Sequence, residues 1–558
     1  MNDHAEKSKR KLFEVVLVLI LCMLFTFILQ FSFSDLIGVD GYYHIAMADL
    51  MRDQGLTLNG SSFPYLYLTT LKDNFADQHF LYHVLLIPFT YLGLLFGAKV
   101  AAAFFAGLAF FSVYLLLRVL TGKHAWWLIL FFPLLSSGFL FRMFLPRAPA
   151  VSLACMLLLI ALQLVYTTKK QSRGFLALLS IGSFFFVWLY GGFVLFGVWC
   201  VMYTAVSLLV SFFSKSYTSF KRVLKSSVAV FLGFIVGLLL HPFFPEILQF
   251  LHIQIFKTGT MASIPVGGEW SSYDFNGFVS NNGIALLIFM LGLIALAINV
   301  VAACVIHKMR LDGEFTKSGT LYWFRLSGAG RSVIVSLGLF SFLLFIMTLV
   351  SKRYVEYFVP FAFVFFCAQF VYFIPLIKNG IKKGVSILPK KVRSILSKKS
   401  VWGGSVFVIL LACGIFLYQY TSIYAFYTSA VENTNERPYS YMEEITQYTL
   451  EHIPEGEIIF NVSWDDFPAL FMGDRKHLYV WGLDPLFLYE HDPRLYEQGK
   501  LVWDVEDPDM LKEIITQDFR STYIYVNRRD EKLIQTLDSR REFKRLVGNE
   551  AGVLYEVL

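Results

Sequence analysis

Long runs of apolar residues, separated by short polar segments, occupy most of the chain. They lie near residues 13–33, 98–119, 125–143, 149–167, 174–191, 193–213, 226–247, 283–306, 332–350, 354–377 and 402–424. An α-helix needs about 20 such residues to cross a bilayer. The strands of a β-barrel would be shorter and would alternate between apolar and polar positions. The pattern therefore predicts a polytopic α-helical membrane protein with about 11 transmembrane helices.

One further apolar segment, 81–95, is short and is interrupted by Pro88. The distribution of Lys and Arg decides how it is placed. The main basic clusters fall on one side of the membrane only if this segment does not cross; they lie at 7–11, 169–173, 215–225, 307–331 and 378–399. The positive-inside rule assigns that side to the cytoplasm, and the N-terminus with it. We therefore expect 81–95 to be an interfacial or partly embedded helix in the first outer loop.

The pattern changes after residue 424, where no long apolar run follows. Strands are expected at 457–463, 477–482, 521–527 and 552–558, and helices at 440–453, 509–519 and 530–539. Strands that alternate with helices predict a small sheet packed by helices. We expect a transmembrane domain at 1–424, with a large first outer loop at 34–97, and a soluble α/β domain at 425–558. The odd number of spans places this soluble domain outside the cytoplasm.

Composition and charge agree with this division. The chain is 56% hydrophobic, whereas soluble domains are about 45–50% apolar. Its net charge of +7 combines 34 Lys and Arg against 15 Asp and Glu up to residue 424 with 14 against 26 after it. Cytoplasmic loops explain the basic residues, and the soluble domain is acidic, so no nucleic acid is expected as a partner. The six cysteines lie in predicted spans without metal-ligand spacing.

Polar chemistry gathers where the first apolar run ends. The segment GVDGYYH follows it directly, and ADQHFLYH (76–83) lies at the start of 81–95; their site candidates are Asp40, Tyr42, Tyr43, His44, Asp77 and His79. Carboxylates and imidazoles at a membrane face can act as a base or bind a divalent cation. The aromatic and imidazole side chains are candidates for substrate binding. A solvated acidic loop is the alternative interpretation.

Two other outer segments carry candidates for ligand binding. VGGEWSSYDFNG (266–277) offers Glu269 and Trp270 after two glycines, which permit a tight turn. A carboxylate beside a stacking aromatic suits a sugar, although an ordinary turn would look the same. Arg142, Arg147 and Arg353 lie at predicted outer helix ends. Arginine is well suited to phosphate binding, and anchoring to lipid headgroups is the alternative.

In the soluble domain, NVSWDDFPAL (461–470) follows a predicted strand and opens an expected helix. Trp464 and Asp465 at this turn are candidates for ligand binding, with capping of the helix as the simpler explanation. The chain has no phosphate-binding loop, dinucleotide fingerprint or nucleophile elbow in a fitting context.

The order of these features resembles the GT-C class of membrane glycosyltransferases, and within it the catalytic subunit of oligosaccharyltransferase. By position, Asp40 is similar to the catalytic acid of the first outer loop and Arg142 to a basic residue of the second. Glu269 is similar to the carboxylate of the mobile outer loop, and Arg353 to an arginine that holds the carrier phosphate. SWDDF (463–467) resembles the acceptor motif WWDYG through one Trp-Asp pair.

The resemblance implies a GT-C fold and transfer of a sugar from a polyprenyl-phosphate or -diphosphate carrier on the extracytoplasmic face. The sequence also departs from the oligosaccharyltransferase pattern. The second outer loop, LPRAPAVS, lacks the acidic pair that helps to bind metal, and SWDDF lacks the closing Tyr-Gly. These departures favour a metal-independent relative in which Asp40 takes the acceptor proton and arginines hold the leaving phosphate. A divalent cation, Mg or Mn, bound by Asp40 and Glu269 is the alternative.

Other functions remain open at this point. One is a strict oligosaccharyltransferase acting on protein Asn. Another is a transporter or flippase of lipid-linked sugars, which would need charged or Gly/Pro-broken segments near the mid-membrane. The expected partners are a polyprenyl-phosphate-linked sugar donor and membrane lipid, with a glycan, lipid or protein as acceptor. The expected location is the inner or plasma membrane, with multiple spans.

Overall fold

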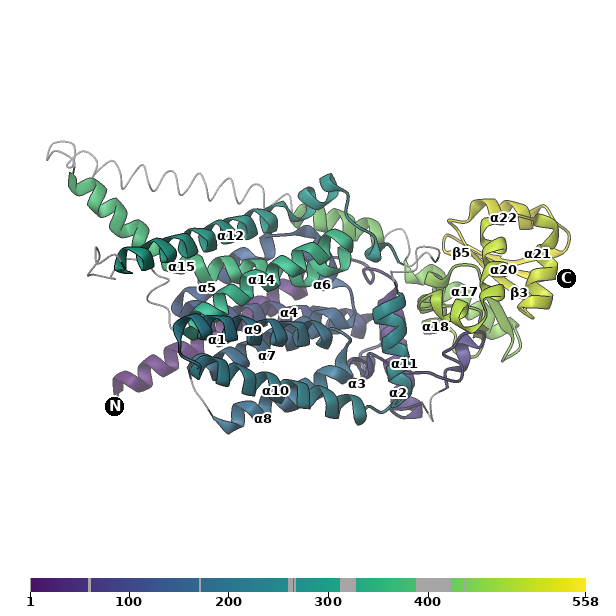
Figure 1. The fold of residues 1–558 in the computed structure, drawn as a ribbon. Helices are drawn as coiled ribbons and strands as arrows, with labels where there is room; N and C mark the ends of the chain where they lie inside the picture. The colour runs from purple at the N-terminus through teal and green to yellow at the C-terminus, as the bar shows by residue number, and fades with distance from the viewer. Residues whose placement is uncertain are drawn as a thin grey trace.

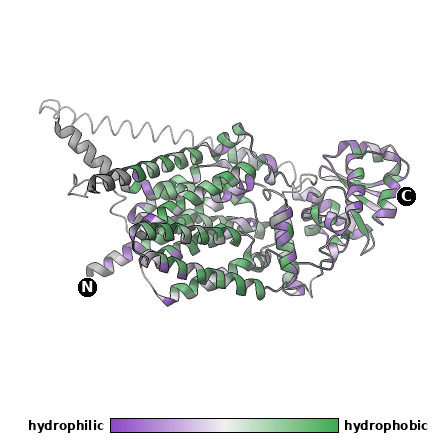
Figure 2. Ribbon diagram, viewed as in Figure 1, coloured by the Kyte–Doolittle hydropathy of each residue, from purple (hydrophilic) through white to green (hydrophobic). Residues whose placement is uncertain are grey.

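The computed structural model describes residues 2–58, 62–169, 172–258, 264, 267–311, 328–387, 423–434 and 438–558. Helices lie side by side in one bundle, and the C-terminal residues form a sheet-containing body at one end of it (Figure 1). Apolar residues cover the length of the bundle (Figure 2). The prediction of a helical membrane protein with a C-terminal α/β region is confirmed.

Within the described residues, eight helical segments are long and apolar enough to cross a membrane. They are Ser8–Gln30, Leu94–Leu134, Ala148–Thr168, Phe193–Ser214, Thr218–Leu239, Phe275–Val301, Gly328–Val350 and Lys352–Val371. The helices concerned are α1 (Asn2–Gln30), α4 (Leu94–Thr121), α7 (Ala148–Thr168), α9 (Phe193–Ser214), α10 (Thr218–Leu239), α12 (Phe275–Leu311), α14 (Gly328–Val350) and α15 (Val355–Ile387). Helix α8 (Arg173–Leu189) is a shorter apolar helix. The predicted span 402–424 lies almost entirely outside the described residues.

Two predicted spans differ from the structure. Segment 125–143 is not one helix but α5 (Ala125–Leu128), the 3-10 helix η3 (Ile129–Leu134) and α6 (Ser137–Phe144). Pro133 interrupts the helical hydrogen bonds, and the Ser136 hydroxyl then caps α6 by accepting from the Phe139 amide at 2.8 Å. The span predicted at 226–247 is instead α10, which ends before the His241-Pro242 pair; a residue that precedes proline disfavours helix.

The predicted first outer loop contains ordered helices. These are α2 (Asp40–Gln54), η1 (Pro64–Leu66) and α3 (Phe80–Thr90), which overlaps the expected interfacial segment 81–95. Helix α2 is buried from Gly41 to Met51 and packs against α3 and α4. A Cβ atom at Gly41 would lie 2.1 Å from the Pro146 side chain. Glycine is therefore needed there for α2 to meet the segment between α6 and α7.

The C-terminal region contains one mixed five-stranded sheet in the order β2-β1-β3-β5-β4. Its strands are β1 (Ile458–Asn461), β2 (Leu478–Tyr479), β3 (Tyr523–Asn527), β4 (Phe543–Gly548) and β5 (Gly552–Val557). Strand β1 is parallel to β2 and β3, with Ile459 opposite Tyr523, and β5 is antiparallel to β3 and β4. The main helices are α17 (Tyr439–His452), α18 (Phe467–Gly473), α19 (Leu486–His491), α20 (Pro493–Asp504) and α22 (Glu531–Asp538). The sequence did not predict β4, an edge strand with exposed polar residues.

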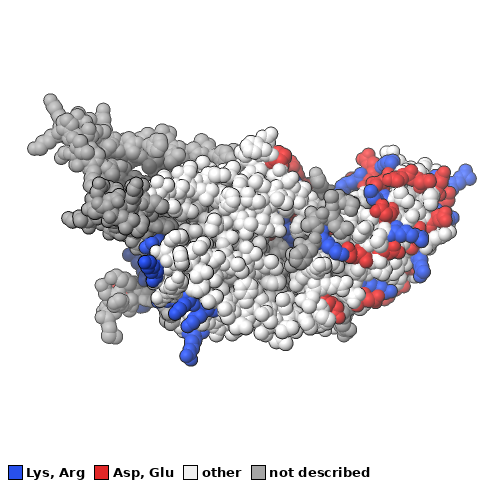
Figure 3. Space-filling view, in the orientation of Figure 1, with Lys and Arg blue, Asp and Glu red and all other residues white. Residues whose placement is uncertain are grey.

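Contacts with α2 fix this region against one end of the bundle. Arg475 donates to Asp49 at 2.8 Å, and the Phe471 ring lies 5.9 Å from that of Tyr43. On the face shown in Figure 3, charged side chains gather over the C-terminal region and at the opposite end of the bundle. A broad uncharged band separates them, as expected for helices that pass through lipid.

Candidate active site

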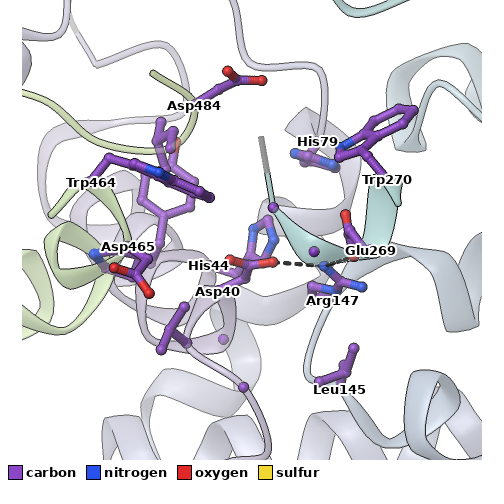
Figure 4. A pocket seen from close by; sticks show the side chains of 18 of the residues that line it. Asp40, His44, His79, Leu145, Arg147, Glu269, Trp270, Trp464, Asp465 and Asp484 are labelled. Atoms are coloured by element: carbon purple, nitrogen blue, oxygen red, sulfur yellow. Dashed lines mark hydrogen bonds and ion pairs between the residues drawn. The ribbon is translucent and has the colours of Figure 1, made fainter. Parts of the chain in front are cut away.

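A cavity of about 660 Å³ lies where one end of the helical bundle meets the C-terminal region. It is lined by residues of α2, the segment before α3, the α6–α7 connection, the turn at 267–270, Arg353 just before α15, and the C-terminal region. Figure 4 shows Trp464 and Asp465 on one side, Arg147, Glu269 and Trp270 on the other, and Asp40 with His44 between them. All predicted site residues except Tyr42 line it: Asp40, Tyr43, His44, Asp77, His79, Arg142, Arg147, Glu269, Trp270, Arg353, Trp464 and Asp465.

Tyr42 does not line the cavity. Its hydroxyl donates to Asp35 at 2.8 Å, and its ring stacks on Tyr439 with centroids 5.1 Å apart. In a helix, Tyr42 lies about 200° around the axis from Asp40, whereas His44 is about 40° away. The prediction treated this segment as a loop, in which that separation of faces does not arise.

Three arginines converge on the carboxylate of Glu269. Arg142 Nη1 and Arg147 Nη1 each donate to Glu269 Oε2 at 2.9 Å. Arg353 Nη1 lies 3.4 Å from Glu269 Oε1. Arg142 also donates to the buried carboxylate of Glu356. The three guanidinium groups thus define one anion position at the membrane face of the cavity.

Local structure holds these groups in place. Arg142 lies in the last turn of α6. The Ser136 and Ser137 hydroxyls donate to Asn282 and Asn281 of α12 at 2.6 and 2.8 Å and so attach the start of α6 to α12. The turn η5 (Gly268–Trp270) carries Glu269, and Ser351 Oγ donates to the Glu269 carbonyl oxygen at 2.9 Å. Ser351 directly precedes the short helix η6 (Lys352–Tyr354), which contains Arg353. The hydrogen bond from Ser351 therefore places Glu269 beside Arg353.

Asp40 begins α2 and pairs with the same arginine as Glu269. Arg147 Nη1 donates to Asp40 Oδ2 at 2.8 Å. The Asp40 side chain is 42% exposed, whereas that of Arg147 is 11% exposed. Among the described residues, Arg147 Nε and Nη2 have no hydrogen-bond partner although they are buried. Arg147 can therefore donate to a further anion while it holds Asp40.

Electrostatics keep the cluster ionised. Burial alone would raise the pKa of Glu269, but Arg147, Arg353 and Arg142 together hold it well below its usual range. Burial would likewise lower the pKa of Arg147, but Glu269, Asp40 and Glu356 raise it well above its usual range. An anion that enters the cavity therefore meets charged guanidinium groups and competes with a charged carboxylate.

Arg353 also interacts with two aromatic side chains. Its Nη2 donates to the Tyr190 hydroxyl at 2.5 Å, and its guanidinium carbon lies 4.8 Å from the Trp270 ring centroid. The His79 ring stacks on Tyr190 with centroids 5.4 Å apart. Sequence reasoning did not select Tyr190, because it lies at the end of an apolar run and only the fold brings it to Arg353.

A hydrogen-bonded chain of imidazoles lies beneath Asp40. His44 Nδ1 lies 2.8 Å from His83 Nε2, and His83 Nδ1 lies 2.6 Å from Asp77 Oδ2. Burial, with neighbouring positive charge, holds the pKa of His44 well below its usual range and lowers that of His79 to about 3. His83 was not among the predicted site residues. Its signal was its spacing of four from His79, which places both on one face of α3.

The C-terminal region supplies the other wall of the cavity. Asp465 accepts from Arg529 at 3.2 Å and from the Ser463 hydroxyl at 2.5 Å. The N-cap residues Ser463, before η7 (Trp464–Asp466), and Asp466, before α18, do not cap these helices with their side chains. Asp484 and Trp503 also line this wall. It presents aromatic faces and carboxylates, which suit the hydroxyl groups and ring faces of a sugar.

The donor set does not fit the alternative of a divalent cation at Asp40 and Glu269. Arg147 Nη1 donates to both carboxylates, at 2.8 and 2.9 Å, and so occupies the position between them. No group of three or more His, Cys, Asp or Glu side chains with metal-site geometry occurs in the described part of the chain. Positive charge at this position comes from guanidinium groups.

The helical bundle, with the cavity between one of its ends and the sheet-containing C-terminal region, was compared with known proteins. The sequence matches no protein-family model and no curated protein. The oligosaccharyltransferase of Archaeoglobus fulgidus in the apo form is similar over 98% of this chain and 74% of its own, with a TM-score of 0.58 and 13% identity.

Two other solved structures share the fold. ArnT from Cupriavidus metallidurans bound to undecaprenyl phosphate matches over 97% of both chains, with a TM-score of 0.53 and 14% identity. The mycobacterial arabinofuranosyltransferase AftD matches over 97% of this chain and 40% of its own, with a TM-score of 0.53 and 13% identity. The predicted GT-C resemblance is thereby confirmed at the level of the fold.

Proposed function

We propose that this protein is a membrane glycosyltransferase that moves a sugar from a polyprenyl-phosphate or -diphosphate carrier to an acceptor hydroxyl. The observation that carries the proposal is the convergence of Arg142, Arg147 and Arg353 on one anion position beside Asp40. The Glu269 carboxylate marks that position. A lipid-anchored phosphate would reach it, because it lies at the outer ends of membrane helices.

In this proposal the arginines stabilise the leaving phosphate. A guanidinium offers a planar fork of donors that matches phosphate oxygens. Arg147 retains buried donors without a hydrogen-bond partner in the described part of the chain, and Arg353 is held in place by Tyr190 and Trp270. Fixed positive charge aimed at a developing anion lowers the barrier without reorganisation. The sugar would then extend toward Trp270 and the wall formed by Trp464 and Asp465.

Asp40 is the proposed base. Its partly exposed carboxylate faces the cavity about one turn from His44. As the acceptor oxygen forms its bond to C1 of the sugar, the bond from C1 to the carrier phosphate breaks. The acceptor proton passes to Asp40, and the polyprenyl phosphate leaves with the electron pair of the broken bond. Arg147 stabilises the Asp40 carboxylate before transfer.

The named ligands of the similar structures support a lipid-linked donor. One ArnT structure contains undecaprenyl phosphate, and one archaeal oligosaccharyltransferase structure contains a dolichol-phosphate with an inhibitory peptide. We further propose that the protein lies in the inner or plasma membrane, with its N-terminus in the cytoplasm. Residues 1–424 would form the transmembrane domain, and 425–558 the soluble extracytoplasmic domain.

A second candidate function is transfer to protein Asn, as in oligosaccharyltransferases. The observation in its favour is that Trp464 and Asp465, the residues of the partial acceptor motif, line the same cavity as Asp40. Another archaeal oligosaccharyltransferase structure contains Zn and sulfate, and this candidate would use a divalent cation. Peptides with and without an acceptor Asn, tested with and without chelator, separate it from transfer to a hydroxyl.

The test is a transfer assay on the full chain in lipid nanodiscs, with polyprenyl-phosphate and -diphosphate sugars as donors and mixed glycans, lipids and peptides as acceptors. Asp40→Asn should reduce transfer by about 10²–10⁴-fold, the usual contribution of a general base. Asp53→Asn is the matched control, since Asp53 lies on the same helix with its side chain 56% exposed. Wild-type rates in Asp40→Asn would overturn Asp40 as the base.

A further inference from the structure

The buried chain Asp77–His83–His44 has no part in the mechanism described so far. Asp77 is 3% exposed, His83 is fully buried and His44 is 5% exposed. The chain begins at the Asp77 carboxylate and ends at His44, and both residues line the cavity. Asp40 and His44 are one turn apart on α2, so their side chains lie on the same face of that helix.

The hydrogen bonds fix which atom donates and which atom accepts at each step of this chain, which we call its direction. Asp77 Oδ1 accepts from the His79 backbone amide at 2.9 Å, so Oδ2 is left to accept from His83 Nδ1. With one proton on each ring, His83 Nε2 is then an acceptor and His44 Nδ1 donates to it. His44 Nε2 consequently carries a lone pair and no proton. A buried carboxylate thereby fixes the tautomer of a ring at the cavity surface.

We propose that His44 Nε2 is the hydrogen-bond acceptor that binds the acceptor substrate's hydroxyl beside Asp40, and that Asp77 and His83 are positioning residues that keep it unprotonated. This inference rests on the proposed function. A hydroxyl that donates to Nε2 is held next to the Asp40 carboxylate. The acceptor oxygen is thereby directed toward C1 of the sugar, whose phosphate lies at the arginines.

A second Asp–His pair shows what a purely structural arrangement looks like. Asp474 Oδ1 accepts from the Lys476 amide at 2.9 Å, and Oδ2 lies 2.6 Å from His477 Nδ1. The other ring nitrogen, His477 Nε2, lies 3.0 Å from the Pro454 carbonyl oxygen. That pair therefore ends inside the protein, whereas the chain from Asp77 ends at the cavity.

Asp77→Asn exchanges donor and acceptor at each hydrogen bond of the chain, and the new side chain has nearly the same size as Asp. The His79 amide still needs an acceptor, so the amide oxygen of the new Asn faces it and the NH2 group faces His83 Nδ1. His83 then carries its proton on Nε2 and donates to His44 Nδ1. His44 Nε2 becomes protonated and loses the lone pair that would bind a hydroxyl.

His83→Gln breaks the imidazole chain but keeps its direction. The NH2 group of the new Gln would face the Asp77 carboxylate, and its oxygen would accept from His44 Nδ1. His44 Nε2 keeps its lone pair in this variant. Asp474→Asn is the matched control, because it makes the same change in the same local geometry away from the cavity.

The direct readout is the modification of His44 by diethyl pyrocarbonate, which attacks unprotonated ring nitrogens. Full-length variants in nanodiscs are treated, and the peptide that contains residue 44 is followed by mass spectrometry. We expect similar rates in wild type, His83→Gln and Asp474→Asn, and a rate at least about tenfold lower in Asp77→Asn. Equal rates in wild type and Asp77→Asn, an unreactive wild-type His44, or an unreactive His44 in His83→Gln would each overturn the inference.

A kinetic measurement tests whether the Asp77–His83–His44 chain affects binding of the acceptor substrate. Asp77→Asn should raise the KM for the acceptor about tenfold, the loss of one hydrogen bond, and leave the KM for the donor unchanged. An equal rise in both would indicate a structural role and overturn the inference. Thermal unfolding identifies a variant that fails to fold, in which case His83→Gln alone decides. If wild type transfers no sugar from any donor, the proposed function fails, and the labelling experiment still decides the direction of the chain.

Discussion

Replacing Glu269 with Gln tests whether the site binds phosphate through guanidinium groups or through a metal ion. In the structure the Glu269 carboxylate lies within 2.9–3.4 Å of three guanidinium groups. If those groups bind the carrier phosphate, Glu269 competes with it for them. Glu269→Gln removes that negative charge and leaves the side chain similar in size, so it should tighten the binding of a polyprenyl phosphate.

The size of the effect follows from Coulomb's law. Two unit charges about 4 Å apart repel by about 1 kcal/mol in water and about 4 kcal/mol at an effective dielectric constant of about 20. The Glu269 side chain is 21% exposed, so solvent and the arginines screen much of this repulsion. We therefore expect a gain near the lower end, about 1.4 kcal/mol, which is a decrease of about tenfold in Kd.

The assay is direct binding of a short-chain polyprenyl phosphate without sugar to full-length protein in nanodiscs. Glu490→Gln is the matched control, because Glu490 is an ion-paired outer-face carboxylate whose side chain is 22% exposed. It pairs with Lys257 at 2.7 Å and does not line the cavity. Weaker binding by Glu269→Gln would refute the reasoning, because it would indicate that Glu269 supports phosphate binding, for instance through a cation.

Three further results are expected. Arg353→Lys should raise the Kd for polyprenyl phosphate about tenfold, since it loses the planar fork and the contact with Trp270; an unchanged Kd in the same binding assay would contradict this. Gly41→Ala should destabilise the protein by about 1–3 kcal/mol, because its Cβ would meet Pro146 at 2.1 Å; thermal unfolding measures this against Gly174→Ala, where the nearest atom is at 3.5 Å. Chelation with EDTA should leave transfer to hydroxyl acceptors unchanged, because Arg147 lies between Asp40 and Glu269; activity lost to EDTA and restored by Mg or Mn would favour the metal-dependent candidate.

Topology explains why much of the site could be predicted. Asp40, Arg147 and Arg353 lie far apart in sequence, but each lies at or beside the end of a helix. Counting spans and basic loops therefore placed them on one face of the membrane. Such a count gives a common face but no distances. The shared contact of Arg147 with Asp40 and Glu269 depends on how α2 packs against the α6–α7 segment at Gly41.

Local features were harder to predict. The segment that contains Asp40 was interpreted as a loop because helix α2 is buried on most sides and shows no amphipathic pattern. That error placed Tyr42 with the cavity residues, although its ring faces Tyr439. His83 lies within an apolar segment, where a lone His is easily taken for a core residue. Only the fold shows that it links Asp77 to His44.

The most direct test of the central claim is an experimental structure of the full chain with a polyprenyl phosphate bound. We predict the phosphate at the position now marked by the Glu269 carboxylate, with oxygens within about 2.7–3.2 Å of Arg147 and Arg353. Glu269 should be displaced from both guanidinium groups, and Asp40 should remain at the cavity surface. A phosphate bound away from these arginines, or attached to Asp40 through a metal ion, would contradict the account.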